Sequence, residues 1–151
     1  KIANMLKINK KLILLSIVGN KFTNKGIDMI LSTLRMNDTL KQISLGNNYL
    51  NSEAFINLAD YLAFNKSLLS LEIKSSKVKD DILKLLSKKL INNNTLINLS
   101  LVDNLLSYEG IISLGQHLYK NPCINHIKVL LNGEREEEPI IKSSNPHLIF
   151  N

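Results

Sequence analysis

Apolar residues recur along the chain with a constant period of about 28 residues, a length typical of one unit in a stack of structural repeats. The repeated frame is Leu-x-x-Leu-x-Leu-x-x-Asn-x-Leu, with Ile, Val or Phe in place of some leucines. Its copies begin at Leu12, Leu40, Leu68, Leu96 and Ile124, and no insertion interrupts the series. The unbroken spacing predicts one repeated unit of strand, turn and helix.

The first half of each repeat predicts a short strand followed by a turn. We expect parallel strands near residues 14–17, 42–45, 70–73, 98–101 and 126–129. The ninth frame position holds an asparagine in four of the copies: Asn20, Asn48, Asn104 and Asn132. Their side chains are expected to hydrogen-bond backbone groups of the turn, because no regular ladder satisfies those groups there. Ser76 takes this position in the third copy, which predicts a locally weaker turn.

The second half of each repeat carries apolar residues three and four positions apart, as at Ile27, Ile30 and Leu34. This spacing places them on one face of a helix, and we expect helices near 25–36, 52–64, 80–92 and 108–120. Each stripe ends at an asparagine: Asn37, Asn65, Asn93 and Asn121. Because asparagine tolerates the left-handed conformation that closes a helix, these four residues are expected to adopt it.

A single repeat of this kind cannot bury its leucine face, whereas neighbouring repeats laid side by side form a continuous core. The pattern resembles the ribonuclease-inhibitor type of leucine-rich repeats over residues 12–132, in period as well as in motif. That resemblance implies an α/β fold: a right-handed, horseshoe-shaped solenoid with a parallel sheet on its concave face and helices on its convex face. It suggests a bacterial effector or a protist member of the class.

The whole chain, residues 1–151, is expected to form one leucine-rich-repeat domain of about five repeats. Ile2, Leu6 and Asn9 lie one full period before their counterparts in the next helix, so the chain is expected to open inside a repeat. Further repeats or another domain are expected upstream, or a neighbouring copy that covers this edge. Residues 133–151 are expected to form an irregular C-terminal repeat or cap, in which 148–150 add a sixth strand or begin another repeat.

The chain carries 19 basic and 13 acidic residues, a formal net charge of +6. Arg35 and Arg135 are its only arginines and aromatic residues make up 5%, which weighs against nucleic-acid binding. Cys123 is the single cysteine, so an intramolecular disulfide is excluded and a reducing compartment is favoured. The expected location is the cytoplasm, or a host cytosol for an effector. No segment suits a membrane span, and no metal or cofactor is expected.

Residues between the frame leucines are expected to point outward from the concave sheet and to contact a protein partner. These candidate site residues are Leu14, Ser16, Val18, Gln42, Ser44, Ser70, Glu72, Lys74, Asn98, Ser100, Val102, Asp103, His126, Lys128 and Leu130. They include no recurring carboxylate pair and no Ser/His/Asp arrangement, so we expect no enzyme. Exposed apolar groups such as Leu14, Val18 and Leu130 commonly mark a partner surface, although packing against a further repeat explains them equally well.

The function predicted from these residues is a protein–protein interaction module that binds a protein through the concave face and the adjoining loops. A host-directed effector is one form of this hypothesis, and recognition of substrates for an attached ligase or effector domain is another. The alternative is a fragment of a GTPase activator of the Ran type, since activators of that type are built from the same repeat. The fold alone does not choose among them.

Overall fold

The computed structural model describes residues 1–129 and 149–150 of the chain. Its helices are α1 (Ile2–Ile8), α2 (Asn24–Leu34), α3 (Ser52–Phe64), α4 (Asp80–Leu90) and α5 (Tyr108–Leu118). Its strands are β1 (Leu14–Ser16), β2 (Gln42–Ser44), β3 (Ser70–Glu72), β4 (Asn98–Ser100), β5 (His126–Lys128) and β6 (Ile149–Phe150).

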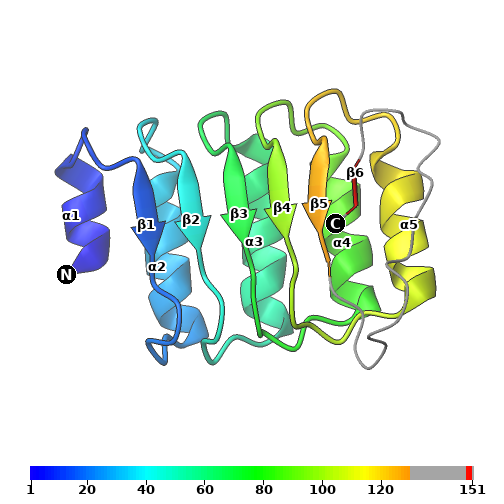
Figure 1. The fold of residues 1–151 in the computed structure, drawn as a ribbon. Coiled ribbons are helices and arrows are strands. Elements are labelled where there is room, and N and C mark those ends of the chain that lie inside the picture. The colour runs from blue at the N-terminus through cyan, green and yellow to red at the C-terminus, as the bar shows by residue number, and fades with distance from the viewer. Residues whose placement is uncertain (130–148, 151) are drawn as a thin grey trace.

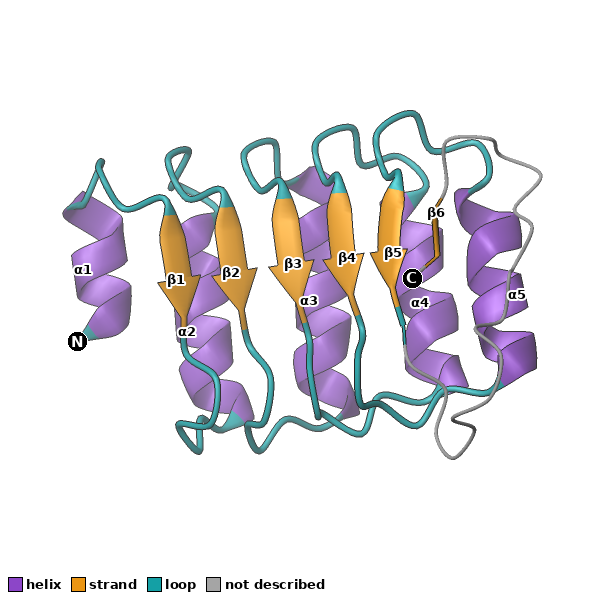
Figure 2. Ribbon diagram, in the orientation of Figure 1, coloured by secondary structure: helices purple, strands orange, loops and turns teal. Residues whose placement is uncertain are grey.

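All six strands form one parallel sheet in the order in which they occur in the sequence. From β1 to β5 the register advances by one full repeat at each step, so that Leu15, Ile43, Leu71 and Leu99 lie side by side. Helices α2, α3 and α4 lie behind the sheet and α1 lies beside β1 (Figures 1 and 2). Each crossover from strand through helix to next strand is right-handed. The predicted α/β repeat solenoid, with a parallel sheet on one side and helices on the other, is confirmed.

The predicted helices are present, but three of them end two residues before the predicted position. After α2 the chain tightens, because Met36 N donates to Thr33 O and Asn37 N donates to Leu34 O, each over 3.1 Å. These bonds span three residues instead of four, which is how the last turn of a helix commonly closes.

The core lies between the sheet and the helices. Strand residues that point toward the helices, such as Leu71 and Leu99, are fully buried. The helical stripe meets them from the other side, with Leu58, Leu86 and Leu114 also buried. Each repeat thus contributes one layer of apolar side chains, which stabilises the fold by about 1.5–3 kcal/mol for each fully buried leucine.

Two asparagines at the ninth frame position join neighbouring turns. Asn48 accepts from Phe22 N over 2.9 Å and donates to Ile17 O over 2.9 Å, both in the preceding repeat. Asn104 is fully buried and makes the equivalent contacts with the turn after β3. The predicted hydrogen bonding to backbone groups of the turn is confirmed for these two residues. It is confirmed also for Asn20, whose side chain donates to Val18 O within its own turn, whereas Asn132 lies outside the described residues.

The asparagines that follow the helices do not adopt the left-handed conformation, so that prediction is wrong. Asn65 has φ −69° and ψ 137°, which is extended backbone. Asn37, Asn93 and Asn121 are likewise absent from the non-glycine residues with positive φ in the described chain. Their side chains close the loop instead: the Asn37 carbonyl oxygen Oδ1 accepts from Leu40 N over 2.9 Å. A side-chain acceptor turns the chain without strained backbone.

Candidate functional site

The predicted site residues that belong to β1 to β5 flank the inward-pointing strand residues, on the face of the sheet that no helix covers, which we call the sheet face (Figure 2). Side chains alternate along a strand. Because Ile43, Leu71 and Leu99 point into the core, their neighbours on either side along each strand point outward. The structure therefore brings residues of β1 to β5 together on one surface.

Exposure varies across the sheet face. Leu14, Ser16, Asn98, His126 and Lys128 are exposed. Gln42, Ser70, Glu72 and Ser100 are half-buried. Ser44 is only 5% exposed, so the surface that it offers to a partner is small. The accessible part of the face consists of its two ends and a shallow polar centre.

The charged candidates beyond the strands are paired with each other. Lys74 follows β3 and Asp103 follows β4, and Lys74 Nζ lies 3.8 Å from Asp103 Oδ2. Ser75 Oγ donates to the same carboxylate oxygen over 3.4 Å. Both charged side chains are about half exposed, so water screens the pair and it contributes little to stability. The other charged candidates on the sheet face are Glu72 and Lys128.

Apolar groups gather at one end of the sheet face. Leu14 is 52% exposed, and Val18 is exposed beside the turn that follows β1. Val102 is half-buried at the equivalent position of the fourth repeat. Leu130, the remaining apolar candidate, lies outside the described residues.

Sequence reasoning missed a second row of residues, at the tenth frame position of each turn. This turn row consists of Lys21, Tyr49, Lys77 and Leu105, each one repeat after the last. All four are exposed, and Tyr49 is 67% exposed. Main-chain bonds fix the apolar members in place, from Tyr49 N to Phe22 O and from Leu105 N to Val78 O. The alternation of basic and apolar residue types at one frame position was the available signal.

Within the described part of the chain, no group of three or more His, Cys, Asp or Glu side chains is arranged to hold a metal ion. No described helix combines the length and apolar character needed to cross a membrane. Two hollows in the described surface lie away from the sheet face, one beside the loops that follow α2 and α3 and one beside α1 and α2. The sheet face is therefore a shallow surface suited to contact with a large partner.

No protein-family model matches the sequence, and no curated protein matches it. Several solved structures share the fold, including one from leiomodin and one from tropomodulin. "Leiomodin-1 Actin-Binding Site 2 (ABS2)" superimposes with a TM-score of 0.77 at 17% identity, over 87% of this chain and 78% of that chain. A tropomodulin C-terminal domain from Caenorhabditis elegans superimposes with a TM-score of 0.75 at 13% identity, over 87% of this chain and 81% of that chain.

These neighbours correct the family assignment made from the repeat. The identification of the chain as a ribonuclease-inhibitor-type protein, with a bacterial effector or protist protein as the suggested member, is wrong, because its structural neighbours are leiomodin and tropomodulin domains. The physical reason is that the leucine frame encodes burial within a strand–turn–helix unit. Any chain that stacks such units satisfies the same frame, so the motif determines the fold and not the class.

Proposed function

We propose that the chain is a protein-binding domain that contacts its partner through the sheet face and the turn row, and that actin is the first partner to test. The observation that carries protein binding is the row of exposed apolar and basic side chains beside an uncovered sheet. The choice of actin comes from the leiomodin-1 structure, which shares the fold over 87% of this chain and is named as an actin-binding site.

The turn row has the chemistry of an interface centre. Tyrosine is enriched at protein interfaces, and Tyr49 is held by its main chain with its ring exposed. Lys21 and Lys77 flank it at the same frame position and attract an acidic partner surface. Val18 and Leu14 extend the apolar surface onto the first strand of the sheet face.

The fold neighbours lend no support to the host-directed effector or to the GTPase activator. A cytoplasmic setting belongs to the proposal, since Cys123 is a free thiol and a reducing compartment preserves it. The irregular repeat or cap expected at 133–151 lies outside the described residues, apart from β6.

The experiment is co-sedimentation of the chain with filamentous actin, together with a fluorescence binding assay on monomeric actin. We expect saturable binding to at least one form. Tyr49→Ser combined with Leu105→Ser should weaken it about tenfold or more, because truncation of an anchoring side chain costs over ~1 kcal/mol. Ile56→Ser is the matched control, because Ile56 is an exposed apolar residue of α3 on the helical side.

The outcomes separate the two parts of the proposal. Absence of binding to either form of actin would remove actin as the partner. Binding that the Tyr49/Leu105 double variant retains in full, and that Ile56→Ser weakens, would move the interface to the helical side. Lys128→Glu tests the sheet face itself, with Lys84→Glu on the exposed surface of α4 as its charge-matched control.

A further inference from the structure

A groove of about 490 Å³ lies beside the loops that lead from α2 and α3 back to the sheet. This volume falls in the range of about 300–1,000 Å³ that is typical of ligand-binding clefts. These return loops follow the helices, whereas the turn row follows the strands, so the two surfaces lie at opposite ends of the repeats (Figure 1). We call this hollow the return-loop groove.

The groove coincides with a departure from the repeat. In three return loops the side-chain amide of the asparagine donates to a main-chain oxygen in the helix of the preceding repeat. The pairs are Asn37 with Leu6, Asn93 with Leu62 and Asn121 with Leu90. Asn65 differs, because its amide donates to Tyr61 Oη over 2.8 Å and to Ser67 Oγ over 3.2 Å. In this repeat Ser67 makes the bond to the return loop of the preceding repeat, because its Oγ donates to Asn37 O over 3.3 Å.

The side chain of Tyr61 explains the departure. Its ring is buried, 2% exposed, and it lines the groove together with Asn65. The equivalent positions one repeat before and after hold Thr33 and Lys89, which are not buried. The buried ring that lines the groove is therefore absent from the equivalent position of the repeats on either side.

The rim of the groove is apolar. Met36 is 80% exposed and Phe64 is 77% exposed, and they occupy equivalent positions one repeat apart. The next two repeats place Asn92 and Lys120 there, which are polar. One repeat earlier the same position holds Ile8, which is 80% exposed. Exposed large apolar side chains at this position therefore run from Ile8 through Met36 to Phe64 and stop there, and such a row commonly marks a docking site.

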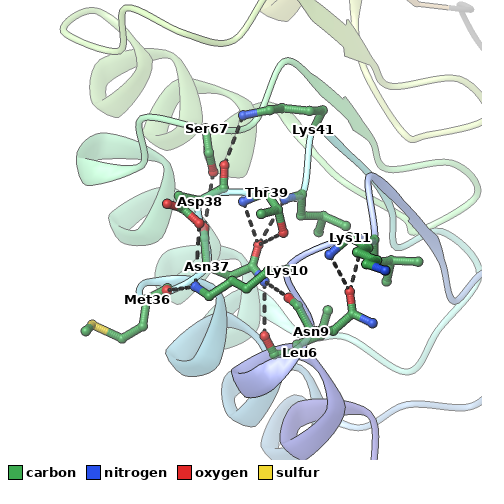
Figure 3. Close-up of polar contacts among 12 residues, drawn as sticks. Leu6, Asn9, Lys10, Lys11, Met36, Asn37, Asp38, Thr39, Lys41 and Ser67 are labelled. Carbon is green, nitrogen blue, oxygen red and sulfur yellow. Dashed lines mark hydrogen bonds and ion pairs between the residues drawn. The ribbon is translucent and has the colours of Figure 1, made fainter.

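The charge of the groove is positive. Arg35 and Lys66 line it and are exposed, and neither forms an ion pair with a described residue. Asp38 is the carboxylate of the lining, and Lys10 Nζ lies 3.5 Å from its Oδ1 (Figure 3). Lys41 Nζ donates to the main-chain oxygen of Asp38 over 3.0 Å. With Asp38 compensated, an acidic ligand is favoured.

We propose that the return-loop groove binds a short acidic peptide segment of a partner protein. A bulky apolar side chain of that segment packs between Met36 and Phe64, above Tyr61. Carboxylates on either side of it face Arg35 and Lys66. This inference goes beyond the proposed function, because it concerns a different surface and holds whatever partner the sheet face binds.

The experiment selects peptides from a random phage-displayed library on the full chain, with counter-selection on the Met36→Ser/Phe64→Ser variant. Enriched sequences are synthesised with a fluorescent label, and their affinity is measured by fluorescence polarisation. We expect acidic peptides with one large apolar residue. Their binding should weaken about tenfold or more in Met36→Ser/Phe64→Ser and in Arg35→Glu/Lys66→Glu, as is usual for loss of anchoring groups.

Met29→Ser is the matched control, because Met29 is exposed on α2 outside this groove. Circular dichroism melting of every variant checks the fold, which substitutions of exposed side chains should preserve. Failure to enrich any peptide, enrichment of basic peptides, or equal binding to the Met36/Phe64 variant would overturn the proposal. Light scattering that detects a dimer which this variant abolishes would also overturn it, by assigning the groove to a second copy of the chain. Actin binding is measured separately, so either proposal can fail alone.

Discussion

The side-chain amide of Asn104 donates to the main-chain oxygen of Ile73 over 2.6 Å, and so joins the turn after β4 to the end of β3. The same side chain accepts from Ser76 N over 3.0 Å and from Val78 N over 3.1 Å. One buried side chain therefore satisfies three backbone groups of the preceding repeat, where no regular ladder can do so.

Asn104→Ala should lower the free energy of unfolding by roughly 2–4 kcal/mol, because it leaves several buried backbone groups without partners. Urea denaturation measures the loss. Asn20→Ala is the control, since Asn20 is exposed and its side chain bonds Val18 O in its own turn. Equal losses in the two variants would contradict the assigned role of Asn104.

Ser76→Asn should raise the free energy of unfolding by about 1 kcal/mol, the usual contribution of an added hydrogen bond. The hydroxyl of Ser76 donates to Lys74 O within its own turn over 3.0 Å and does not reach the turn after β2. An asparagine there can bond that turn as Asn48 and Asn104 bond theirs. The same denaturation assay tests this, and an unchanged or lower midpoint would argue against it.

Gly46→Ala should destabilise the protein by about 1–3 kcal/mol, the typical cost of overpacking. A Cβ at Gly46 would overlap Lys74 O and lie 2.8 Å from Lys74 N, and both are main-chain atoms that cannot rotate away. Gly26→Ala is the matched control in α2, where a Cβ meets the movable ring of Phe22 at 3.0 Å. That control should be neutral or stabilising by about 0.5–1 kcal/mol, and the reverse order of the two variants would refute the argument.

Leu45→Ala, Leu71→Ala and Leu99→Ala should each lower the free energy of unfolding by roughly 2–5 kcal/mol, the usual cost of truncating a buried leucine. All three are 0–1% exposed in the layer between sheet and helices. Chemical denaturation with losses below about 1 kcal/mol at every position would show that this layer is not the core.

Tyr61 should make stability fall at alkaline pH. Burial raises the pKa of its phenol, and the hydrogen bond from Asn65 lowers it only in part. Above the ordinary tyrosine pKa of about 10 the unfolded chain releases the proton first, so stability present below that pH is lost as pH rises, by up to ~1.4 kcal/mol per pH unit.

Tyr61→Phe removes the phenol and with it this pH-dependent loss of stability. The difference in unfolding free energy between wild type and variant should therefore shrink or invert as pH rises above about 10. At neutral pH the variant should cost about 1 kcal/mol, for the lost bond to Asn65. Denaturation curves recorded across this pH range isolate the effect, because the other tyrosines and the lysines are common to both proteins. A constant difference would contradict it.

The period of the leucine frame predicted the strands, the helices and the register, as the alignment of Leu15, Ile43 and Leu71 confirms. The outward positions of the strands also followed from alternation. The turn row was missed because its frame position alternates between basic and apolar residues and therefore lacks the uniform hydrophobic signal of the leucine positions. Tyr49 and Leu105 become visible as a surface only when neighbouring turns lie beside each other.

The sequence by itself determined the repeating unit and its stacking, because burial of an apolar stripe depends on the order of residues along one repeat. Only the tertiary structure decided how one repeat meets the next. Asn65 bonds Tyr61 while Asn37 bonds Leu6, although both asparagines occupy the same frame position. The difference arises because Tyr61 places a buried phenol within hydrogen-bonding distance of Asn65, whereas the equivalent position before Asn37 holds Thr33. A contact between repeats thus depends on which side chains the neighbouring positions supply.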